Sequence, residues 1–338
     1  MFSQRLLEWH EKNARDLPWR GEKDPYKIWV SEIMLQQTTA QTVKGYYARF
    51  LAAFPTVEAL AAADEERVLK LWEGLGYYSR ARNLMKAAAI VARDMGGKLP
   101  GDAAALKRLP GIGDYTAAAI ASMAYGQPEP AMDGNLTRVL ARVTAEQGCV
   151  GETAVKKRLC AAGEALIDRE RPGDFNQAMM GLGNLVCVPL RPRCEDCPVA
   201  EFCRARELGC AGELPHMPPK LDRKKERRGV TIVSCGDRVL VRRRPENALL
   251  GGLWEYPNFE NAVDAASLTE CLAELGVHAR FVKKLGSANH VFTHKVWQMT
   301  AFLFTAEVLP ETENLRGVTA EELSRLPMPT AMTKLRRP

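Results

Sequence analysis

The proline-rich, charged stretch near the middle of the chain constrains its fold more than any other feature. Residues 211–229 read AGELPHMPPKLDRKKERRG. Prolines interrupt a helix and like charges repel one another, so we expect an extended, solvated linker. Before it, residues 1–210 hold segments rich in Ala and Leu that are separated by Gly and Pro, for example 65–72, 79–95 and 116–124. This pattern predicts an all-α body.

Beyond the linker the pattern changes to that of a sheet. Residues 230–244 and 296–309 alternate apolar and polar side chains, as half-buried strands do, and a helical stretch lies between them near 268–275. We therefore expect residues 230–338 to form a second domain of mixed α and β structure. The chain has 338 residues, of which 46% are hydrophobic, so two such domains can bury full cores without disulfide bonds.

Charge and the N-terminal segment limit the setting in which the chain works. The formal net charge of +6 favours attraction to a polyanion but does not identify one. The N-terminal segment lacks the apolar core of a signal peptide, and no apolar run approaches the roughly 20 residues that span a bilayer. We expect a protein of the reducing cytoplasm without a membrane anchor, and by default a monomer. Five cysteines show no pairing pattern: Cys149, Cys160, Cys210, Cys235 and Cys271.

Four other cysteines form a compact set. Cys187, Cys194, Cys197 and Cys203 are separated by six, two and five residues. Four thiolates this close in sequence suit a tetrahedral zinc ion or an iron–sulfur cluster, because both need several soft anionic ligands. Zinc sites more often pair two CxxC units and this set contains one, which favours a [4Fe-4S] cluster. The spacing alone leaves the metal open. The clustering of the four cysteines within 17 residues argues against four unrelated buried cysteines.

The segment LPGIG joins two predicted helices, one at 103–109 and one that begins near Tyr115. Pro110 does not fit inside a helix, and Gly111 and Gly113 have no Cβ, so a phosphate can approach consecutive backbone N–H groups. Such a loop binds a DNA backbone without reading the bases. On the two glycines alone, an ordinary turn between helices is the favoured interpretation.

Two carboxylates stand in surroundings that differ from each other. Glu32 lies within KIWVSEIMLQQT, among large apolar residues. Desolvation there would raise the pKa of Glu32, as a general acid that works near neutral pH requires. The simpler interpretation places Glu32 on the wet face of an amphipathic helix. Asp133 follows a proline-containing loop and precedes a predicted helix, where its simpler role is an N-cap.

In chain order, SEIMLQQT, LPGIG, MDGNLTRVLAR and the four cysteines resemble the motifs of the helix-hairpin-helix DNA glycosylases with an iron–sulfur cluster, the superfamily of endonuclease III. The resemblance covers about residues 1–210 and implies an all-α glycosylase body with a [4Fe-4S] cluster loop at 187–203. Bifunctional members carry a nucleophilic lysine two residues after the second hairpin glycine, where this chain has Tyr115. The resemblance therefore implies a monofunctional enzyme that forms no Schiff base.

Within that superfamily the chain is more similar to the MutY-type adenine DNA glycosylases. The segments DLPWR at 16–20 and GLGYYSRARNL at 74–84 carry this similarity, together with the second domain. It implies a repair enzyme that excises adenine mispaired with 8-oxoguanine, and also adenine opposite G, from double-stranded DNA. Such an enzyme extrudes the base from the stack before it acts. The expected location is the cytoplasm, on the nucleoid.

The resemblance also implies roles for single residues. Glu32 would protonate N7 of adenine and an ionised Asp133 would stabilise the oxocarbenium-like sugar, as one protonated and one charged carboxyl do in glycosidases. Tyr115 and Asn135 would orient these carboxyl groups. Arg20 and Gln177 would bind the adenine edge. Gln37, Leu75 and Tyr77 would fill or wedge the opened base stack. The full set expected to contact DNA or adenine in this domain is Arg20, Gln37, Leu75, Tyr77, Gly111, Gly113 and Gln177.

A cluster ligated by four cysteines has no coordination site left for substrate, so its expected role is structural. It would hold the loop Pro189–Arg193, with Arg191 and Arg193, against DNA phosphates. Arginines that are only solvated fit the sequence equally well.

The second domain looks like a Nudix domain, from GGLWEYP at 251–257 and TECLAELGV at 269–277. Active Nudix hydrolases hold Mg²⁺ with several carboxylates on one helix. Here Thr269 and Ala273 replace the arginine and one glutamate of that motif, whereas Glu270 and Glu274 remain. The resemblance implies an α+β domain that recognises 8-oxoguanine without hydrolysis.

The expected contacts to the lesion lie in the segment VFTH. They are Phe292, Thr293 and His294, and Thr293 stands where the family has serine. Its hydroxyl group keeps the hydrogen-bonding capacity and adds a methyl group. A strand end or a surface turn is the simpler interpretation of this segment.

Two other functions remain open at this point. A thymine or uracil glycosylase on the same scaffold would fit the missing lysine but not the Nudix-like domain. A DNA-binding iron–sulfur redox sensor would use the carboxylates only as structural residues. Release of adenine from a duplex that contains adenine opposite 8-oxoguanine distinguishes the three.

Overall fold

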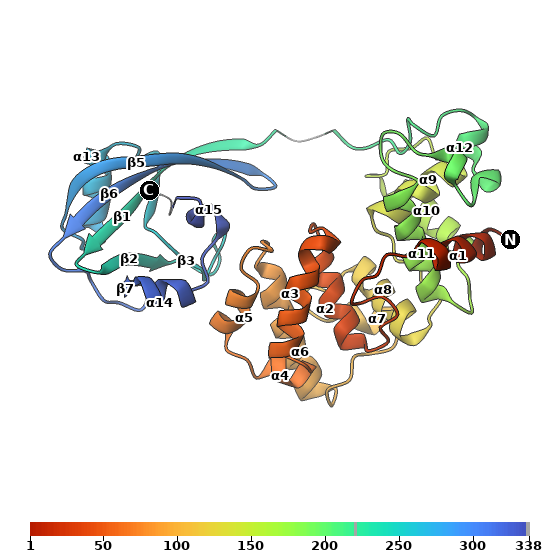
Figure 1. Cartoon of the computed structure of the whole chain (residues 1–338), viewed down its shortest axis with the longest axis horizontal. Coiled ribbons are helices and arrows are strands. Elements are labelled where there is room, and N and C mark those ends of the chain that lie inside the picture. Colours follow the sequence, from red (N-terminus) through yellow and green to blue (C-terminus); the bar gives the residue numbers. More distant parts are fainter. Residues whose placement is uncertain (220–221, 336–338) are drawn as a thin grey trace. The chain divides into compact units, whose positions relative to one another are not determined.

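A computed structural model describes residues 1–219 and 222–335 and divides the chain into two compact units (Figure 1). The first unit comprises Met1–Ala63 and Arg82–Pro219. The second comprises Asp64–Ala81 and the chain from residue 220 onward. Residues 220–221 of the predicted linker and 336–338 of the predicted second domain lie outside the described residues.

The first unit is helical, as the sequence predicts. Its closing loop holds two 3₁₀ turns, Cys194–Asp196 and Ala200–Phe202, and α6 begins within the second unit and continues into the first. The helices are α1 (Phe2–Asn13), α2 (Pro25–Leu35), α3 (Ala40–Ala53), α4 (Val57–Ala61), α6 (Ser79–Asp94), α7 (Ala103–Leu106), α8 (Asp114–Tyr125), α9 (Gly134–Thr144), α10 (Thr153–Leu166), α11 (Pro172–Leu185) and α12 (Arg204–Glu207).

Two buried helices, α2 and α8, pack against each other inside this unit. Asp24 starts α2, because its side chain accepts hydrogen bonds from the backbone N–H groups of Tyr26 and Lys27, and Pro25 takes the first helical position. The alanine-rich run of α8 allows close approach, and its residues 116–123 are all buried. Polar residues in the packed parts of these two helices, such as Ser31, Glu32 and Thr116, are therefore withdrawn from water.

The predicted helix–turn–helix is present, with a shorter first helix than expected. Helix α7 ends at Leu106 rather than at 109, because Pro110 disfavours helical backbone in the residue before it. Gly111 has a φ of +78°, and a Cβ at this position would lie 2.6 Å from the Cβ of Asn83. Glycine is thus required there by both the backbone and the packing.

The second unit contains a mixed sheet and confirms the predicted α and β domain. Strands β1 and β6 pair in parallel, and the other pairs are antiparallel. The strand order is β3-β2-β1-β6-β5, with β4 beside β1 and β7 beside β2. The elements are α5 (Glu65–Leu71), β1 (Lys224–Cys235), β2 (Arg238–Arg243), β3 (Trp254–Glu255), β4 (Asn258–Glu260), α13 (Ala265–Glu274), β5 (Ala279–Val291), β6 (Lys295–Ala306), β7 (Leu315–Thr319), α14 (Ala320–Arg325) and α15 (Thr330–Thr333).

Hydrophobic cores cover both faces of this sheet. Along β6, Trp297 and Met299 belong to a core shared with α14 and α15, whereas Phe302 and Phe304 belong to a core shared with α13. Successive side chains of a strand point to opposite faces, which explains the change from odd to even positions. Figure 1 shows the helices on the two sides of the sheet.

The predicted linker, 211–229, is shorter than expected. Strand β1 already begins at Lys224, because residues 224–234 pair with β6 and the sheet satisfies their backbone hydrogen bonds. Residues up to 219 pack with the helical unit: Leu214 is buried, and its carbonyl accepts a hydrogen bond of 2.9 Å from Arg142 Nε.

Helix α5 and the loop after it also depart from the predicted boundaries. The segment Asp64–Ala81 groups with the second unit rather than with the body at 1–210. Trp254 Nε1 donates to Glu66 Oε1 at 2.8 Å, and the Tyr78 hydroxyl donates to the carbonyl of Met328 at 3.3 Å. These long-range contacts have no local signal in the sequence.

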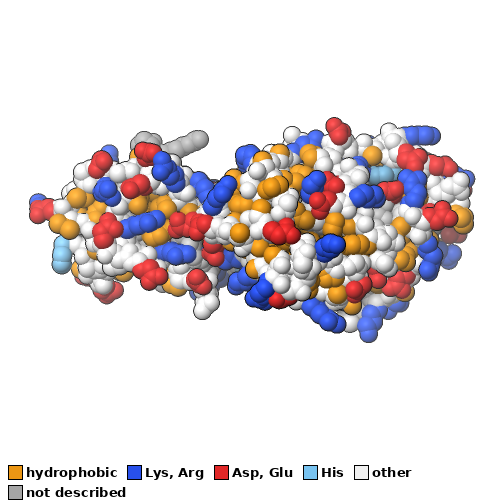
Figure 2. Space-filling view, turned by 90° about the horizontal axis from the view of Figure 1, so that it is seen from below, with side chains coloured by type: hydrophobic (Ala, Val, Ile, Leu, Met, Phe, Trp, Pro, Cys, Tyr) orange, Lys and Arg blue, Asp and Glu red, His pale blue; other side chains and the backbone are white. Residues whose placement is uncertain are grey.

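On the face that Figure 2 shows, basic and acidic side chains are interspersed over both units rather than gathered into one patch of a single sign. The net positive charge therefore does not locate a nucleic-acid surface on this face. Among the residues that the structure describes, no helix is long and apolar enough to cross a bilayer.

Candidate active site

Glu32 is a buried carboxyl on α2. Glu32 is 3% exposed, and burial raises its pKa to about 7. Desolvation is the largest cause, because it penalises the charged form of the carboxyl. The structure therefore excludes the wet helix face as the position of Glu32 and gives it the protonation range of a general acid near neutral pH.

Tyr115 on α8 contacts this carboxyl directly. The tyrosine hydroxyl donates a short hydrogen bond to Glu32 Oε2. Burial and the neighbouring Glu32 raise the pKa of Tyr115 well above its ordinary value, so the phenol remains a donor. Tyr115 is therefore a neutral hydrogen-bond donor to Glu32.

Asp133 is both an N-cap and a neighbour of this pair. Its Oδ1 accepts from the backbone N–H of Leu136 at 2.7 Å, which starts α9, and its Oδ2 accepts from Asn135 Nδ2 at 2.7 Å. Burial raises the pKa of Asp133, while these hydrogen bonds oppose the shift by favouring the charged form. The charge of Asp133 also raises the pKa of Glu32, so the two carboxyl groups influence each other electrostatically.

Asn135 is itself held by a residue that the sequence analysis did not single out. Arg138 Nη2 donates to Asn135 Oδ1 and to the carbonyl of Gly183, each at 2.8 Å, and Arg138 Nε donates to the carbonyl of Cys187 at 2.9 Å. A Cβ on Gly183 would lie 2.7 Å from the Cβ of Asn135, so glycine allows α11 to approach α9 here. In the sequence, Arg138 and Arg142 lie four residues apart, and this spacing was the available sign that one face of α9 carries two arginines.

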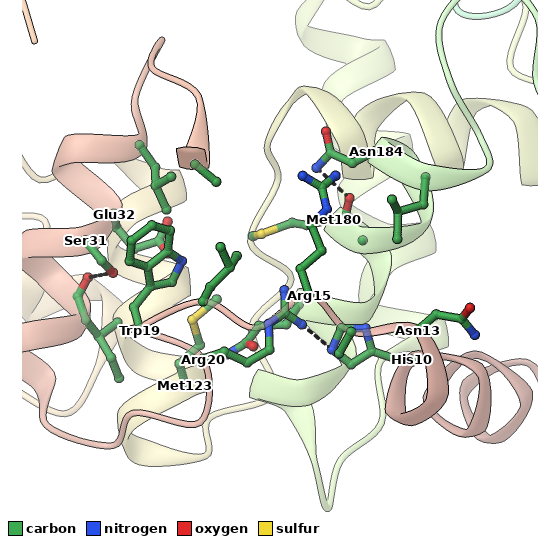
Figure 3. A pocket seen from close by; sticks show the side chains of 18 of the residues that line it. His10, Asn13, Arg15, Trp19, Arg20, Ser31, Glu32, Met123, Met180 and Asn184 are labelled. Atoms are coloured by element: carbon green, nitrogen blue, oxygen red, sulfur yellow. Dashed lines mark hydrogen bonds between the residues drawn. The ribbon is translucent and has the colours of Figure 1, made fainter. Parts of the chain in front are cut away.

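One cavity in the helical unit brings together four of the predicted residues. Glu32, Tyr115, Arg20 and Gln177 all line it. Figure 3 shows Glu32 and Trp19 at one part of this pocket and Arg20 joined to His10 at another. The cavity therefore places a protonatable carboxyl and several hydrogen-bond donors around one space, which suits a flat heterocyclic base.

Two residues expected to enter the base stack have unusual backbone conformations. Gln37, just after α2, has a φ of +58°, and Tyr77 has a φ of +49°. Both are exposed, and non-glycine residues in this left-handed region concentrate at functional sites. Leu75, in contrast, is buried, so Tyr77 is the exposed side chain of the predicted pair.

The segment Phe292–His294 forms the turn between β5 and β6, as its simpler interpretation predicted. Phe292 packs edge to face on Trp297, with ring centroids 4.8 Å apart. The Thr293 hydroxyl lies 3.0 Å from the Tyr77 hydroxyl, so the second unit brings two predicted contact residues together. Thr293 and His294 are exposed.

The four predicted ligand cysteines line a single cavity. Arg142, a fully buried residue of α9, contacts it: Nη1 lies 3.2 Å from Cys187 Sγ and 2.8 Å from the carbonyl oxygen of Val188. A buried guanidinium beside a sulfur atom offsets the negative charge of a ligand thiolate. In the loop that follows, Arg191 and Arg193 are both exposed, and Arg193 also donates to the carbonyl of Leu185.

Helix α13 carries the Nudix-like positions. Glu270 and Glu274 are exposed, one turn apart, and Thr269 and Ala273 occupy the positions that differ from an active motif. Within the described residues, 1–219 and 222–335, no group of three or more His, Cys, Asp or Glu side chains converges so as to hold one metal ion.

Comparisons with known proteins agree with this division of the chain. Residues 30–161 match the model of the HhH-GPD superfamily of base excision DNA repair proteins, and residues 229–337 match that of the NUDIX domain. The adenine DNA glycosylase of Homo sapiens is 36% identical, over 99% of this chain and 73% of that protein.

Solved structures resemble the helical part. A thermostable thymine-DNA glycosylase has 31% identity and a TM-score of 0.55, over 61% of this chain and 95% of that one. An endonuclease III–DNA complex, at 23% identity, has a TM-score of 0.52 over 61% of this chain and 94% of that one, which shows the fold. With its HhH-GPD body, its Nudix-like second domain and its similarity to a named relative along nearly its whole length, the chain belongs to the adenine DNA glycosylases, repair enzymes that bind DNA and hydrolyse the N-glycosyl bond of adenine.

Proposed function

We propose that this enzyme removes adenine paired with 8-oxoguanine, and adenine opposite G, without forming a Schiff base. The observation that carries the proposal is the buried Glu32–Tyr115 contact, with Tyr115 at the lysine position. A phenol with a raised pKa is neither a nucleophilic amine nor a base at neutral pH, so a water molecule has to complete the reaction.

The chemistry follows from the two carboxyl groups. Glu32, protonated below about pH 7, donates its proton to N7 of the extruded adenine. The bond between C1′ and N9 then breaks, and its electron pair leaves with the base. The carboxylate of Asp133, oriented by Asn135, stabilises the cationic sugar until water adds to C1′ and loses a proton.

Arg20 and Gln177 line the same cavity as Glu32 and supply donors to the adenine edge. Gln37 and Tyr77, exposed and in left-handed backbone conformations, fill the space that the base leaves. Gly111 and Gly113 bring a DNA phosphate to the N-terminus of α8, where Gly113 provides no side-chain cap to the free N–H groups.

The four cysteines fit a [4Fe-4S] cluster better than a zinc ion. They line a shared cavity, and their spacing contains one CxxC unit, whereas zinc sites more often pair two. Cys187, Cys194, Cys197 and Cys203 would hold the cluster, whose contribution is to fix the surrounding loop. Arg142 would offset the negative charge through Cys187, and the exposed Arg191 and Arg193 are the loop arginines that would contact phosphate.

The second unit recognises the base opposite adenine. Phe292, Thr293 and His294 occupy an exposed turn, and Thr293 shares a hydrogen bond with Tyr77. Helix α13 keeps two exposed glutamates, Glu270 and Glu274, which are too few for the metal site of a pyrophosphate hydrolase. The role of this unit is therefore to bind the base without hydrolysis.

The expected location and oligomeric state complete the proposal: the enzyme acts on nucleoid DNA as a monomer.

Adenine release under single-turnover conditions tests this function. Duplexes with A opposite 8-oxoguanine, A opposite G, T opposite G and U opposite G are compared, and excision is expected for the first two, faster for the first. Borohydride added during the reaction should trap no covalent enzyme–DNA product. Release of thymine or uracil alone, or a trapped imine, would refute the proposal.

A further inference from the structure

Arg20 reaches the base cavity from the segment between α1 and α2, and its partner there is unexpected. Arg20 Nη1 lies 2.5 Å from Nε2 of His10 on α1, a contact drawn as a dashed line in Figure 3. Within residues 1–219 and 222–335, Arg20 Nε is buried without a hydrogen-bond partner. The guanidinium is thus fixed at one end by an imidazole and keeps unused donors in the pocket.

The chemistry of the two side chains defines the state of His10. A guanidinium has only donors, so Nε2 of His10 must present its lone pair and the ring must be the neutral Nδ1–H tautomer. His10 is 8% exposed and packs against α11, where a Cβ on Gly181 would lie 3.4 Å from His10 Nδ1. This distance is that of an ordinary van der Waals contact, so the ring packs closely against α11.

The other charges around His10 compensate one another. Arg171 pairs with Glu11 on α1 at 2.7 Å and with Asp174 on α11 at 2.9 Å. Arg20 is the charged group that touches the ring, and burial together with Arg20 lowers the pKa of His10 to about 4. Between about pH 4 and pH 7 the imidazole consequently stays an acceptor while Glu32 is protonated. A histidine of ordinary pKa would become charged in the lower part of this range and repel Arg20.

We propose that His10 is a positioning residue for the reaction: it accepts the hydrogen bond of Arg20 and holds the guanidinium so that its free N–H groups bind acceptor nitrogens of the extruded adenine. This inference rests on the proposed function of the cavity. It assigns to α1 a part in substrate recognition, which acts through Arg20 and not by contact with the base.

Substitutions at position 10 separate acceptor capacity from packing. His10→Leu removes the acceptor and keeps most of the volume, so the single-turnover rate constant for adenine release should fall about tenfold, the effect of one hydrogen bond to a charged group. His10→Gln places a carbonyl oxygen near the former Nε2 and should restore the rate to within about threefold. His278→Leu, at an exposed position of the second unit, is the matched control and should have no effect. Equal losses in His10→Leu and His10→Gln would refute the proposal.

A double-mutant cycle shows whether His10 acts through Arg20. In an Arg20→Leu background, His10→Leu should cause no further loss of rate, whereas independent structural damage would add. Nitrogen NMR of the His10 ring provides a readout that does not depend on excision. The ring should show the Nδ1–H tautomer in the unmodified enzyme, and its pKa should rise in Arg20→Leu because a neighbouring cation is lost. An Nε2–H tautomer would overturn the proposal even if the enzyme releases adenine. If the enzyme releases no adenine, the proposed function is refuted, and the spectrum still shows whether His10 accepts the hydrogen bond of Arg20.

Discussion

The predicted catalytic residues of the helical unit and the predicted lesion contacts of the second unit differ in their exposure to solvent. In the helical unit Glu32 and Tyr115 are buried on α2 and α8, and Asp133 is withdrawn at the start of α9. In the second unit Thr293 and His294 stand exposed on the turn between β5 and β6. Bond cleavage needs desolvated groups with altered pKa values, whereas recognition of a base in DNA needs accessible ones. We therefore propose that the helical unit carries out the chemistry and the second unit discriminates between substrates, and the following substitutions test this proposal.

The largest effect is expected for Glu32→Gln. The amide keeps the size of the side chain and can still accept from Tyr115, but it has no proton to give to N7. General acid catalysis contributes roughly 10²–10⁴ in rate, so the single-turnover rate constant should fall by about 10³ or more, with duplex affinity within about threefold of the original. Glu8→Gln, at an exposed glutamate of α1, is the control. Substantial remaining excision would show that chemistry in the helical unit does not depend on this buried acid.

Asp133→Asn should cause the next largest loss. Asparagine remains a good N-cap for α9, so the helix should persist, while the negative charge opposite the sugar cation is removed. We expect a fall of about 10²–10³ in the rate of adenine release, the usual cost of one electrostatic stabiliser. Asp264→Asn, the cap of α13, is the matched control, since it changes a cap without an expected role in catalysis. A similar loss in both variants would indicate damage to helix ends rather than to the reaction.

The dependence of excision on pH should follow the buried acid. The pKa of Glu32 is raised to about 7, so the proton required for N7 is present below that pH and is lost as the pH rises through it. The single-turnover rate should fall about tenfold for each pH unit above 7. On the acid side it should fall as Asp133, whose pKa is raised by burial, takes up a proton. A rate that keeps rising to pH 9 would contradict the assignment of Glu32 as the acid.

The smallest effect is expected in the second unit, for Tyr77→Phe. This change removes the 3.0 Å hydrogen bond between Tyr77 and Thr293, an exposed bond that contributes about 0.5–1.5 kcal/mol. The preference for A opposite 8-oxoguanine over A opposite G should fall about threefold, while the maximal rate of excision changes little. Tyr125→Phe also loses a hydrogen bond, to the carbonyl of Leu99, and serves as the control. An equal loss of rate on both substrates would assign this pair to chemistry instead of discrimination.

Several elements could be predicted because their causes are local. The alanine-rich helices, the hairpin at Gly111 and the alternation along β6 depend on periodicity and on turn residues close in sequence. The predicted end of the linker at residue 229 differs from the structure, in which β1 begins at Lys224, and the reason lies in the tertiary structure. Residues 224–229 have the composition of a solvated segment, but pairing with β6 gives their backbone groups partners, and Glu226 is buried with a hydrogen bond of 2.6 Å from Lys295 Nζ.

The candidate site shows the same limit. The types of residue at 32, 115 and 133 could be named from motifs, but each had a simpler local interpretation, and Asp133 turned out to be an N-cap as well. Arg138 and Arg142 lie within the segment MDGNLTRVLAR but had no predicted role, and His10 lies outside the motifs. Their roles arise from contacts with Asn135, with Cys187 and with Arg20, which lie on separate segments of the chain.

The sequence alone determined the helical and mixed halves of this protein, the four closely spaced cysteines, the missing lysine and the acidic residues available for chemistry. Only the tertiary structure decided that Glu32 is withdrawn from water, that Tyr115 donates to it and that His10 accepts from Arg20. The reason is physical: a pKa and a tautomer depend on solvent access and on neighbouring charges, and both are set by residues that are distant in the chain and become adjacent only when the helices pack.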